Sequence, residues 1–470
     1  MKIVGLEREG SVRPLQFTLL TALMALGFGY DLGALLVNQR YLNDHFMLRG
    51  NEADVISGTY VLGMLLGLFL GGWLNYGSGR RICMISGALL GLIAILTSIF
   101  APNLSILLCT QFVIGFAFGL YLLSVTLYVP EIMQPRIRGF ACSAVTMVLS
   151  VGILAAVLTR DYNLFRREPL VLAGYAFFTL IVLVVSVVRL PESPRFLAGT
   201  DLPDAALNAL FKLRSQMSIA AHELAGINEC YRLEARGAQF FLQNQHFRRS
   251  FWTLLTLTLL LHASGFGILP YALTDLFSFS HSSLFYHSPD FSYGLLKAAF
   301  TVFLFGVVTT ALMADRLGRR ALLFVAALLI NISLLILLVS LLLGKFFFAP
   351  LVITMGVLLY IFASSIAAVL ILFILLPELS PARGREFALS SVLICFCAAG
   401  LFGLQVYVQV IAVLGFAALM LLFFVFSLLL TVVVWFTVPN TANVPLESIE
   451  NRLLEGSDLT SLGLTRERHV

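Results

Sequence analysis

Residues 311–320 have the sequence Ala-Leu-Met-Ala-Asp-Arg-Leu-Gly-Arg-Arg, and the closing Gly318-Arg319-Arg320 repeats Gly79-Arg80-Arg81 from 239 positions earlier. Two further pairs of segments recur at nearly the same spacing: Glu131/Arg138 with Glu378/Arg385, and Pro191-Glu192-Ser193 with Pro439-Asn440-Thr441. Self-similarity at a fixed offset indicates an internal repeat. The chain is therefore expected to consist of two related halves.

The composition restricts what these halves can be. Of the 470 residues, 59% are hydrophobic and only 12% are charged, and the mean hydropathy is +0.96. A soluble domain has about 25% charged residues, so the composition excludes a water-soluble enzyme as well as a disordered chain. With about 20 residues for each membrane-spanning helix, we expect an all-α membrane protein with twelve helices. The expected spans are 17–38, 54–74, 82–101, 105–129, 140–159, 170–189, 251–277, 293–314, 321–343, 349–376, 387–410 and 412–438.

The basic residues predict the orientation. Of the 30 Lys and Arg residues, 23 fall on the side of the N-terminus if there are twelve spans. Loops rich in Lys and Arg stay in the cytoplasm, so both termini are expected there. The expected parts are a six-helix half at 1–189, a cytoplasmic linker with short amphipathic helices at 190–250, a second half at 251–438 and a cytoplasmic tail at 439–470. In the linker, Leu207, Leu210, Phe211 and Leu213 have helical spacing.

The repeated charges predict a cytoplasmic gate. Acids and bases at the cytoplasmic ends of helices can pair across the two halves when the inner mouth is shut and separate when it opens. Ordinary topogenic charge is the alternative, but it would need only the bases. The candidate gate residues are Arg80, Arg81, Glu131, Arg138, Glu192, Arg195, Asp315, Arg319, Glu378 and Arg385.

Five motifs resemble the sugar porter family of the major facilitator superfamily, and the match extends over the whole chain. They are Gly29-Tyr30-Asp31-Leu32-Gly33, Pro191-Glu192-Ser193-Pro194-Arg195-Phe196-Leu197, the segment 311–320, the pattern Glu378-x-x-Pro381-x-x-x-Arg385, and Pro439-Asn440-Thr441 before Leu446-Glu447-Ser448-Ile449. The resemblance implies the major-facilitator fold in two six-helix pseudo-repeats, with a substrate site between the halves near the middle of the membrane.

The departures from the family pattern concern the first half and the substrate site. Tyr76 replaces the acid that Asp315 provides in the second half, and the proline expected after Glu131 is displaced to Pro135. At the positions that the resemblance implies for substrate contact, the candidates are Gln111, Thr146, His262, Ser264, Tyr271 and Phe373. A site that leaves sugar hydroxyls unbonded loses roughly 1 kcal/mol or more for each missing partner, so a hexose is expected to bind poorly.

Asp31 and His262 are the candidates for proton coupling. Ionisable groups inside a membrane are costly and usually functional, and the resemblance implies that an acid at position 31 carries the coupled proton. The arginine expected near it is Gln111 here. A permanently protonated Asp31 is the alternative, and for His262 the alternative is a histidine satisfied by a neighbour.

The sequence therefore predicts a transporter of a small organic solute, such as a sugar or sugar-like metabolite, that works by alternating access with proton symport. Transport of a less hydroxylated metabolite such as an organic acid is one alternative, and a non-transporting sensor is another. The six cysteines lack a metal or redox spacing, so no cofactor and no metal are expected. The expected partners are the solute, protons and the bilayer, without nucleic acid, for a monomer in a bacterial inner membrane.

Overall fold

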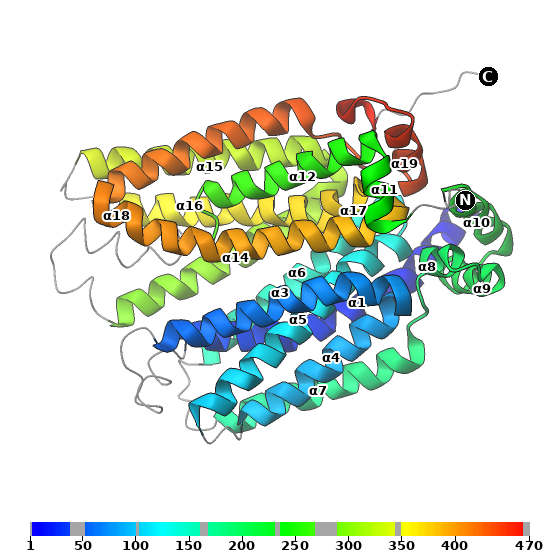
Figure 1. The fold of residues 1–470 in the computed structure, drawn as a ribbon, viewed down its shortest axis with the longest axis horizontal. Helices are drawn as coiled ribbons and strands as arrows, with labels where there is room; N and C mark the ends of the chain where they lie inside the picture. The colour runs from blue at the N-terminus through cyan, green and yellow to red at the C-terminus, as the bar shows by residue number, and fades with distance from the viewer. Residues whose placement is uncertain are drawn as a thin grey trace.

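The computed structural model describes residues 2–37, 52–99, 103–159, 168–230, 236–267, 289–343 and 349–463. Over these residues the regular structure is entirely helical. Figure 1 shows two groups of long helices lying side by side, with the short helices collected at one end.

The first group comes from the N-terminal part of the chain. Its members are α1 (Lys2–Val37), α3 (Glu52–Ser78), α4 (Arg80–Ile99), α5 (Leu104–Ile132), the 3-10 turn η1 (Pro135–Ile137), α6 (Arg138–Thr159) and α7 (Glu168–Arg189). The first helix begins well before the expected residue 17, because the polar residues ahead of the apolar run continue the same helix.

The second group contains α12 (Gln245–Ala263), α14 (Pro289–Leu317), α15 (Arg319–Leu342), α16 (Ala349–Val369), the π-helical turn η3 (Leu370–Leu375), α17 (Leu376–Glu378), η4 (Ala382–Gly384) and α18 (Arg385–Thr437). The two groups meet where α6 packs against α14 and α3 packs against α18. Any site between the halves must be built mainly from these four helices and their neighbours.

Ten stretches of the described residues are long and apolar enough to cross a membrane. The expected sixth and seventh spans correspond to α7 and α12. In α7 the apolar stretch Phe178–Arg189 is short, and α12 begins with a charged turn that contains Arg248 and Arg249. With these two helices, each of the twelve expected spans has a helical counterpart.

The last two spans are continuous in α18 except at one glycine. Gly415 has φ 81° and ψ 174° inside this 53-residue helix. A side chain is strained at this φ, so the glycine provides the tight turn expected between the eleventh and twelfth spans, a few residues later than the sequence suggested.

The expected seventh span, 251–277, does not form one continuous helix, and its last residues, 268–277, lie outside the described residues. The helix α12 ends at Ala263, and a turn follows over residues 264–267. Gly265 and Gly267 have φ values of 102° and 80°, which an α-helix cannot contain. The two glycines therefore break the helix near the expected substrate site.

Small residues allow close helix packing in the first half. A Cβ atom placed on Gly29 would lie 2.1 Å from the carbonyl oxygen of Leu149 in α6, and one on Gly33 would lie 2.7 Å from that of Ile153. Close backbone approach at small residues is a common means of helix association in membranes. Both glycines flank Asp31, so this packing fixes the depth and direction of its helix.

The linker and tail form the short helices at one end of the molecule (Figure 1). They are α8 (Pro194–Gly199), α9 (Pro203–Arg214), α10 (Met217–Cys230), α11 (Gly237–Gln243), α19 (Leu446–Leu454) and η5 (Leu459–Ser461). Leu210 and Leu213 of α9 are fully buried, as the apolar pattern predicted. Phe211 instead faces outward and is 42% exposed, because it lies about 160° around the helix from the buried Leu213.

Candidate functional site: a two-sided gate and a buried polar cluster

Two carboxylates at the linker end of the bundle each hold two arginines and one hydroxyl group. Glu131 at the end of α5 accepts from Arg80 through a two-point contact of 3.2 and 3.3 Å, from Arg385 at 3.4 Å, and from the Ser193 hydroxyl. A guanidinium carries its donors in a fixed planar fork, which suits such contacts with a carboxylate. The side chains of Glu131 and of both arginines are at most 2% exposed.

Glu378 in α17 has the same environment in the other half. It accepts from Arg319 at 3.1 Å, from Arg138 at 2.6 Å and from the Thr441 hydroxyl. These residues are the repeat partners of those around Glu131, so the sequence repeat is also a repeat of geometry. In each cluster one arginine comes from the same half as the carboxylate and the other comes from the opposite half.

Among the described residues, three ion pairs join the halves at this end. They are Arg138 with Glu378, Arg385 with Glu131, and Arg80 with Glu386. Six of the ten candidate gate residues belong to these two clusters, and Asp315 joins them through Arg319 at 3.0 Å. The bundle is shut at this end in the conformation observed.

The pair of Arg80 with Glu386 reflects a difference between the two copies of the repeat: the acid stands on a different helix in each copy. In the second copy, Asp315 accepts from the backbone N–H groups of Gly139 and Phe140 at the start of α6, at 3.0 and 2.8 Å. A Cβ atom on Gly139 would lie 2.6 Å from the Asp315 carboxylate, so this site needs glycine. In the first copy, Tyr76 replaces the acid, and Glu386 stands at the position that matches Gly139. The acid has moved from one helix to the facing helix, where it bonds Arg80.

Two candidate gate residues act within one half. The carboxylate of Glu192 accepts from the backbone N–H groups of Arg80 and Arg81, both at 3.1 Å, and the side chain of Arg81 donates to the carbonyl of Val187. Asn440 accepts from the N–H group of Arg319 in the same manner at 3.2 Å. Burial raises the pKa of Glu192 even though these backbone groups favour the charged form. Glu192 therefore caps the start of α4.

Arg195 connects the linker to the tail. Its guanidinium donates to Glu447 at the start of α19, over 2.5 Å. Burial alone would raise the pKa of Glu447, but the charges of Arg195, Arg385 and Arg138, with a backbone hydrogen bond, together outweigh burial and hold that pKa below its ordinary value. This fourth contact places α19 against the linker helix α8. The C-terminal motif Leu446-Glu447-Ser448-Ile449 is thus part of the shut end.

A cluster of buried polar groups lies within the membrane-spanning part of the first half. Asp31 of α1 is 6% exposed, and Gln111 of α5 is the hydrogen-bonding side chain that faces it. One oxygen of Asp31, the amide oxygen of Gln111 and the hydroxyl of Tyr60 in α3 have no hydrogen-bond partner among the described residues. An unsatisfied buried polar group costs about 1–3 kcal/mol. Three such groups close together suit a site that a solute or water completes.

His262 lies in the second half, near the end of α12. Its ring packs edge-on against Phe396 at 4.3 Å and against Phe266 at 5.6 Å between centroids. Its Nδ1 atom has no hydrogen-bond partner in the described part of the chain. The backbone carbonyl of Thr258 interacts with the ring electrostatically, beyond hydrogen-bonding distance. No contact between His262 and Asp31 is present among the described residues.

The other substrate candidates differ in how their polar groups are used. The hydroxyls of Thr146 and Ser264 donate to carbonyls in their own helices, at 2.9 and 2.7 Å. Phe373 lies in the π-helical turn and lines a small cavity with Val125 and Cys142 of the first half. Tyr271 lies outside the described residues. Of the candidates that the structure describes, Gln111 and His262 thus keep an unbonded polar atom.

Sequence reasoning missed Tyr60 and Glu386. Tyr60 lies in an apolar stretch of α3 and is 3% exposed, and its hydroxyl lies near Asp31 and Cys397. One turn further along α3, the sulfur of Met64 contacts that of Cys397 in α18 at 4.0 Å. No sequence motif includes Tyr60, so the sequence did not single it out. Glu386 follows a gate arginine directly, and comparison of Gly139 with its repeat position would have found it.

Comparison with known proteins agrees with this architecture. The model of a family described as "Sugar (and other) transporter" matches residues 17–453. The chain belongs to this sugar transporter family. Among its relatives, the galactose-proton symporter of Escherichia coli strain K12 is 25% identical over 449 residues, which cover 94% of this chain and 95% of the symporter. The arabinose-proton symporter of the same strain is 24% identical over 447 residues and 94% of both chains.

Solved structures show that this member of the sugar transporter family has the major-facilitator fold. The proton:xylose symporter XylE bound to 6-bromo-6-deoxy-D-glucose has a TM-score of 0.80 and 19% identity, covering 93% of this chain and 98% of XylE. The inward open conformation of XylE from Escherichia coli has a TM-score of 0.63 over a similar share. The chain is thus less similar to the inward open conformation of XylE than to the form bound to 6-bromo-6-deoxy-D-glucose.

Proposed function

We propose that the chain is a secondary transporter that carries a sugar or sugar-like solute together with protons by alternating access. The observation that carries the proposal is the pair of repeat-related carboxylates, Glu131 and Glu378, each bonded to an arginine of the opposite half. Buried ion pairs of this kind hold the two halves together only while water is excluded and both partners of each pair are present. The named relatives, two sugar-proton symporters of nearly full-length similarity, support the solute class and the proton.

The proposed cycle uses the linker end as the inner gate. With the halves at 1–189 and 251–438 as the two moving bodies, opening separates Arg138 from Glu378 and Arg385 from Glu131, and water then hydrates all four groups. The 23 basic residues on the side of the N-terminus support a cytoplasmic position for this end and for both termini. We place the protein in a bacterial inner membrane as a monomer.

Asp31 is the proposed proton carrier. It lies in the buried cluster with Gln111 and Tyr60, where no arginine of the described part of the chain pairs with it. An acid without a fixed counter-ion can take up and release a proton as the site alternates between the two sides. His262 is the rival group, and its aromatic contacts with Phe396 and Phe266 favour a neutral ring that contacts the solute.

The site itself favours a solute with fewer hydroxyl groups than a hexose, which keeps a less hydroxylated metabolite as the second candidate. Thr146 and Ser264 donate their hydroxyl groups to nearby backbone carbonyls, and Phe396 presents an aromatic ring to His262. Hydroxyls that enter such a site lose water without gaining a partner. D-glucose and D-xylose are therefore expected to be poor substrates.

A solute panel tests the proposal. The purified protein should be screened by thermal shift, because a ligand that binds the folded state raises its melting temperature. Solutes that bind should then be tested for accumulation in proteoliposomes with an imposed pH gradient. Accumulation that a protonophore abolishes is the expected result. A protein that binds a solute but never moves it would support the non-transporting sensor instead.

A further inference from the structure

The tail helix α19 places one buried carboxylate against the turn that carries gate residues of the second half. Glu450 is 3% exposed. Its Oε2 atom accepts from the backbone N–H group of Ala382 at 3.0 Å, and its Oε1 atom has no hydrogen-bond partner among the described residues. A carboxylate that is taken out of water for a single neutral donor costs stability, so its position indicates a role other than stability.

The turn that Glu450 contacts fixes the position of a gate arginine. Ala382 begins the 3-10 turn η4, which leads directly into Arg385 at the start of α18. The Nε atom of Arg385 donates back to the carbonyl of Ser380 at 3.1 Å, while its Nη1 atom reaches Glu131 of the opposite half at 3.4 Å. A shift of the turn would therefore draw Arg385 away from Glu131.

The first copy of the repeat has proline at the place of Ala382. Pro135 and Ala382 each stand four residues after the gate carboxylate of their half, and each begins a 3-10 turn. The residue before each has nearly the same backbone conformation, with ψ 147° in the first copy and 145° in the second. Proline has no N–H group, so the first copy needs no acceptor here. Alanine in the second copy leaves an N–H group, and Glu450 satisfies it.

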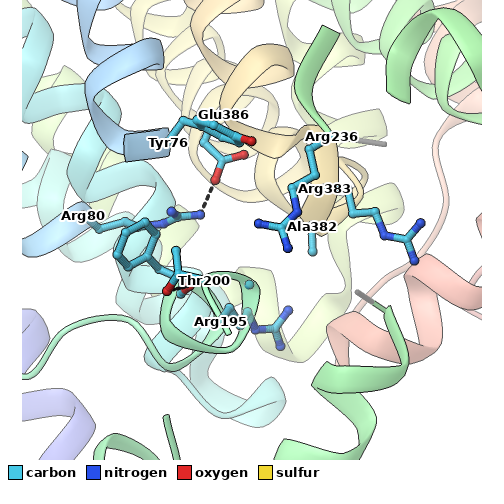
Figure 2. Close-up of a pocket in the computed structure, with 10 residues that line it drawn as sticks. Tyr76, Arg80, Arg195, Thr200, Arg236, Ala382, Arg383 and Glu386 are labelled. Atoms are coloured by element: carbon cyan, nitrogen blue, oxygen red, sulfur yellow. Dashed lines mark hydrogen bonds and ion pairs between the residues drawn. The ribbon is translucent and has the colours of Figure 1, made fainter. Parts of the chain in front are cut away.

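Ala382 also lies where the halves meet. It lines a small pocket together with Arg80 of the first half and Arg195 of the linker, and Arg80 is bonded to Glu386 there (Figure 2). Opening of the inner mouth would separate these residues and admit water to the turn. The N–H group of Ala382 therefore depends on Glu450 while the mouth is shut, whereas an exposed N–H group can bond water.

We propose that Glu450 is a positioning residue of the inner gate, which holds the turn at Ala382 where Arg385 can reach Glu131. The inference rests on the proposed function, because it assigns the tail helix a part in keeping the inner mouth shut. It also separates the two copies of the repeat: proline holds the turn of the first half, and the tail holds that of the second.

The role requires the acceptor oxygen of Glu450 more than its charge. Burial raises the pKa of Glu450 above its ordinary value, although the bond from Ala382 and the charges of Arg385, Arg195 and Arg383 favour the charged form. Burial thus disfavours the charge, whereas the N–H group of Ala382 needs only an oxygen that accepts. Glutamine provides that oxygen without a charge, and leucine of similar size removes it.

The test measures opening of the inner mouth in the full-length protein, as the rate at which a maleimide alkylates Cys142 when the other five cysteines are replaced. Cys142 is 4% exposed and lines the cavity between the halves. Glu450→Leu should raise the rate about fivefold or more, because the N–H group of Ala382 is then unbonded in the shut state. Glu450→Gln should label like the wild type. So should the control Glu455→Leu, which changes an exposed acid directly after α19.

Proline at position 382 supplies the decisive comparison, because it removes the donor as the first copy of the repeat does. Ala382→Pro alone should raise the labelling rate, since Glu450 is then buried without a partner. The double variant Ala382→Pro/Glu450→Leu lacks both donor and acceptor, and it should label within about twofold of the wild type, because removing both partners of a buried hydrogen bond can be nearly neutral.

A wild-type rate in Glu450→Leu would overturn the proposal, and so would effects that simply add in the double variant. A rate in Glu450→Gln as high as in Glu450→Leu would overturn it as well, because the charge rather than the acceptor would then hold the turn. If Glu450→Leu does not fold, restored folding in the double variant supports the proposal and its absence overturns it.

Glu378→Gln, measured in the same background, separates this inference from the proposed function. Faster labelling in Glu378→Gln with no change in Glu450→Leu would leave the inner gate in place and remove Glu450 from it. No change in either variant would count against the inner gate itself.

Discussion

Replacing Glu378 by glutamine should open the inner mouth. In the shut state this carboxylate holds Arg138 at 2.6 Å and Arg319 at 3.1 Å, and all three side chains are at most 1% exposed. In the variant Arg319 still pairs with Asp315 at 3.0 Å. Arg138 is therefore the residue that loses its ion pair. Once the mouth opens, water hydrates Arg138, and the variant loses little there.

The expected shift can be estimated from the lost contact. A hydrogen bond to a charged group contributes about 1.5–3 kcal/mol, and each 1.4 kcal/mol changes an equilibrium about tenfold. Glu378→Gln should therefore raise the open population about tenfold to a hundredfold. Arg138 keeps the carbonyls of Val444 and Thr441 at 3.1 and 3.4 Å, which favours the lower end of this range.

A native cysteine reports the opening. Cys142 is 4% exposed and lines the small cavity between the halves with Val125, Thr126 and Phe373, beside the gate. With the other five cysteines replaced, its rate of alkylation by a permeant maleimide should follow the open population. The rate should rise about tenfold or more in Glu378→Gln.

The control is a pair at the surface. Asp458 and Arg249 lie 3.5 Å apart, with side chains that are 79% and 54% exposed, and such pairs contribute only about 0–1 kcal/mol. Asp458→Asn should therefore label like the wild type. An unchanged labelling rate in a well-folded Glu378→Gln protein would refute the idea that this carboxylate holds the mouth shut.

Three further predictions concern the proton, the tail and the packing of the first helix. Asp31→Asn should abolish accumulation driven by a pH gradient but leave solute exchange, while His262→Gln should still accumulate; the opposite pattern in proteoliposomes would move the proton to the histidine. The lowered pKa of Glu447 means that its contribution to stability is present at neutral pH and is lost as the pH falls through that lowered value, so the difference in melting temperature between wild type and Glu447→Gln should shrink towards acid pH. Gly29→Ala should destabilise by about 1–3 kcal/mol because its Cβ has no room, whereas Gly77→Ala, with no atom near the added carbon, should melt within a degree or two of wild type.

The gate was predictable because its residues occur twice. Glu131 and Glu378 are 247 residues apart, and each is followed by an arginine seven residues later. The repetition indicates that both pairs have the same role. The helices were predictable from apolar length alone. Their ends were not, since the turn at Gly415 depends on one glycine and the break after Ala263 on two, all in otherwise apolar runs.

The buried polar cluster was only partly predictable. A motif marked Asp31, and alignment with the family pattern marked Gln111. Tyr60 has no counterpart in either, and its unbonded hydroxyl becomes evident only when α3 is packed against its neighbours. Sequence also could not show that Thr146 and Ser264 use their hydroxyl groups within their own helices, because that depends on the rotamer each side chain adopts.

The burial of so many charges at one end of the bundle argues for switching rather than for stability. Replacing a buried ion pair by apolar residues of similar size is often neutral or stabilising, whereas removing one partner is costly. A fold that needed only to stay closed would gain little from Glu131, Glu378 and their arginines. In a fold that must open, the same ion pairs can separate at modest net cost, because water hydrates each charged group as its bond breaks. The acid that moved from position 76 to Glu386 strengthens this argument, since the pair across the halves is kept although the helix that supplies the acid has changed.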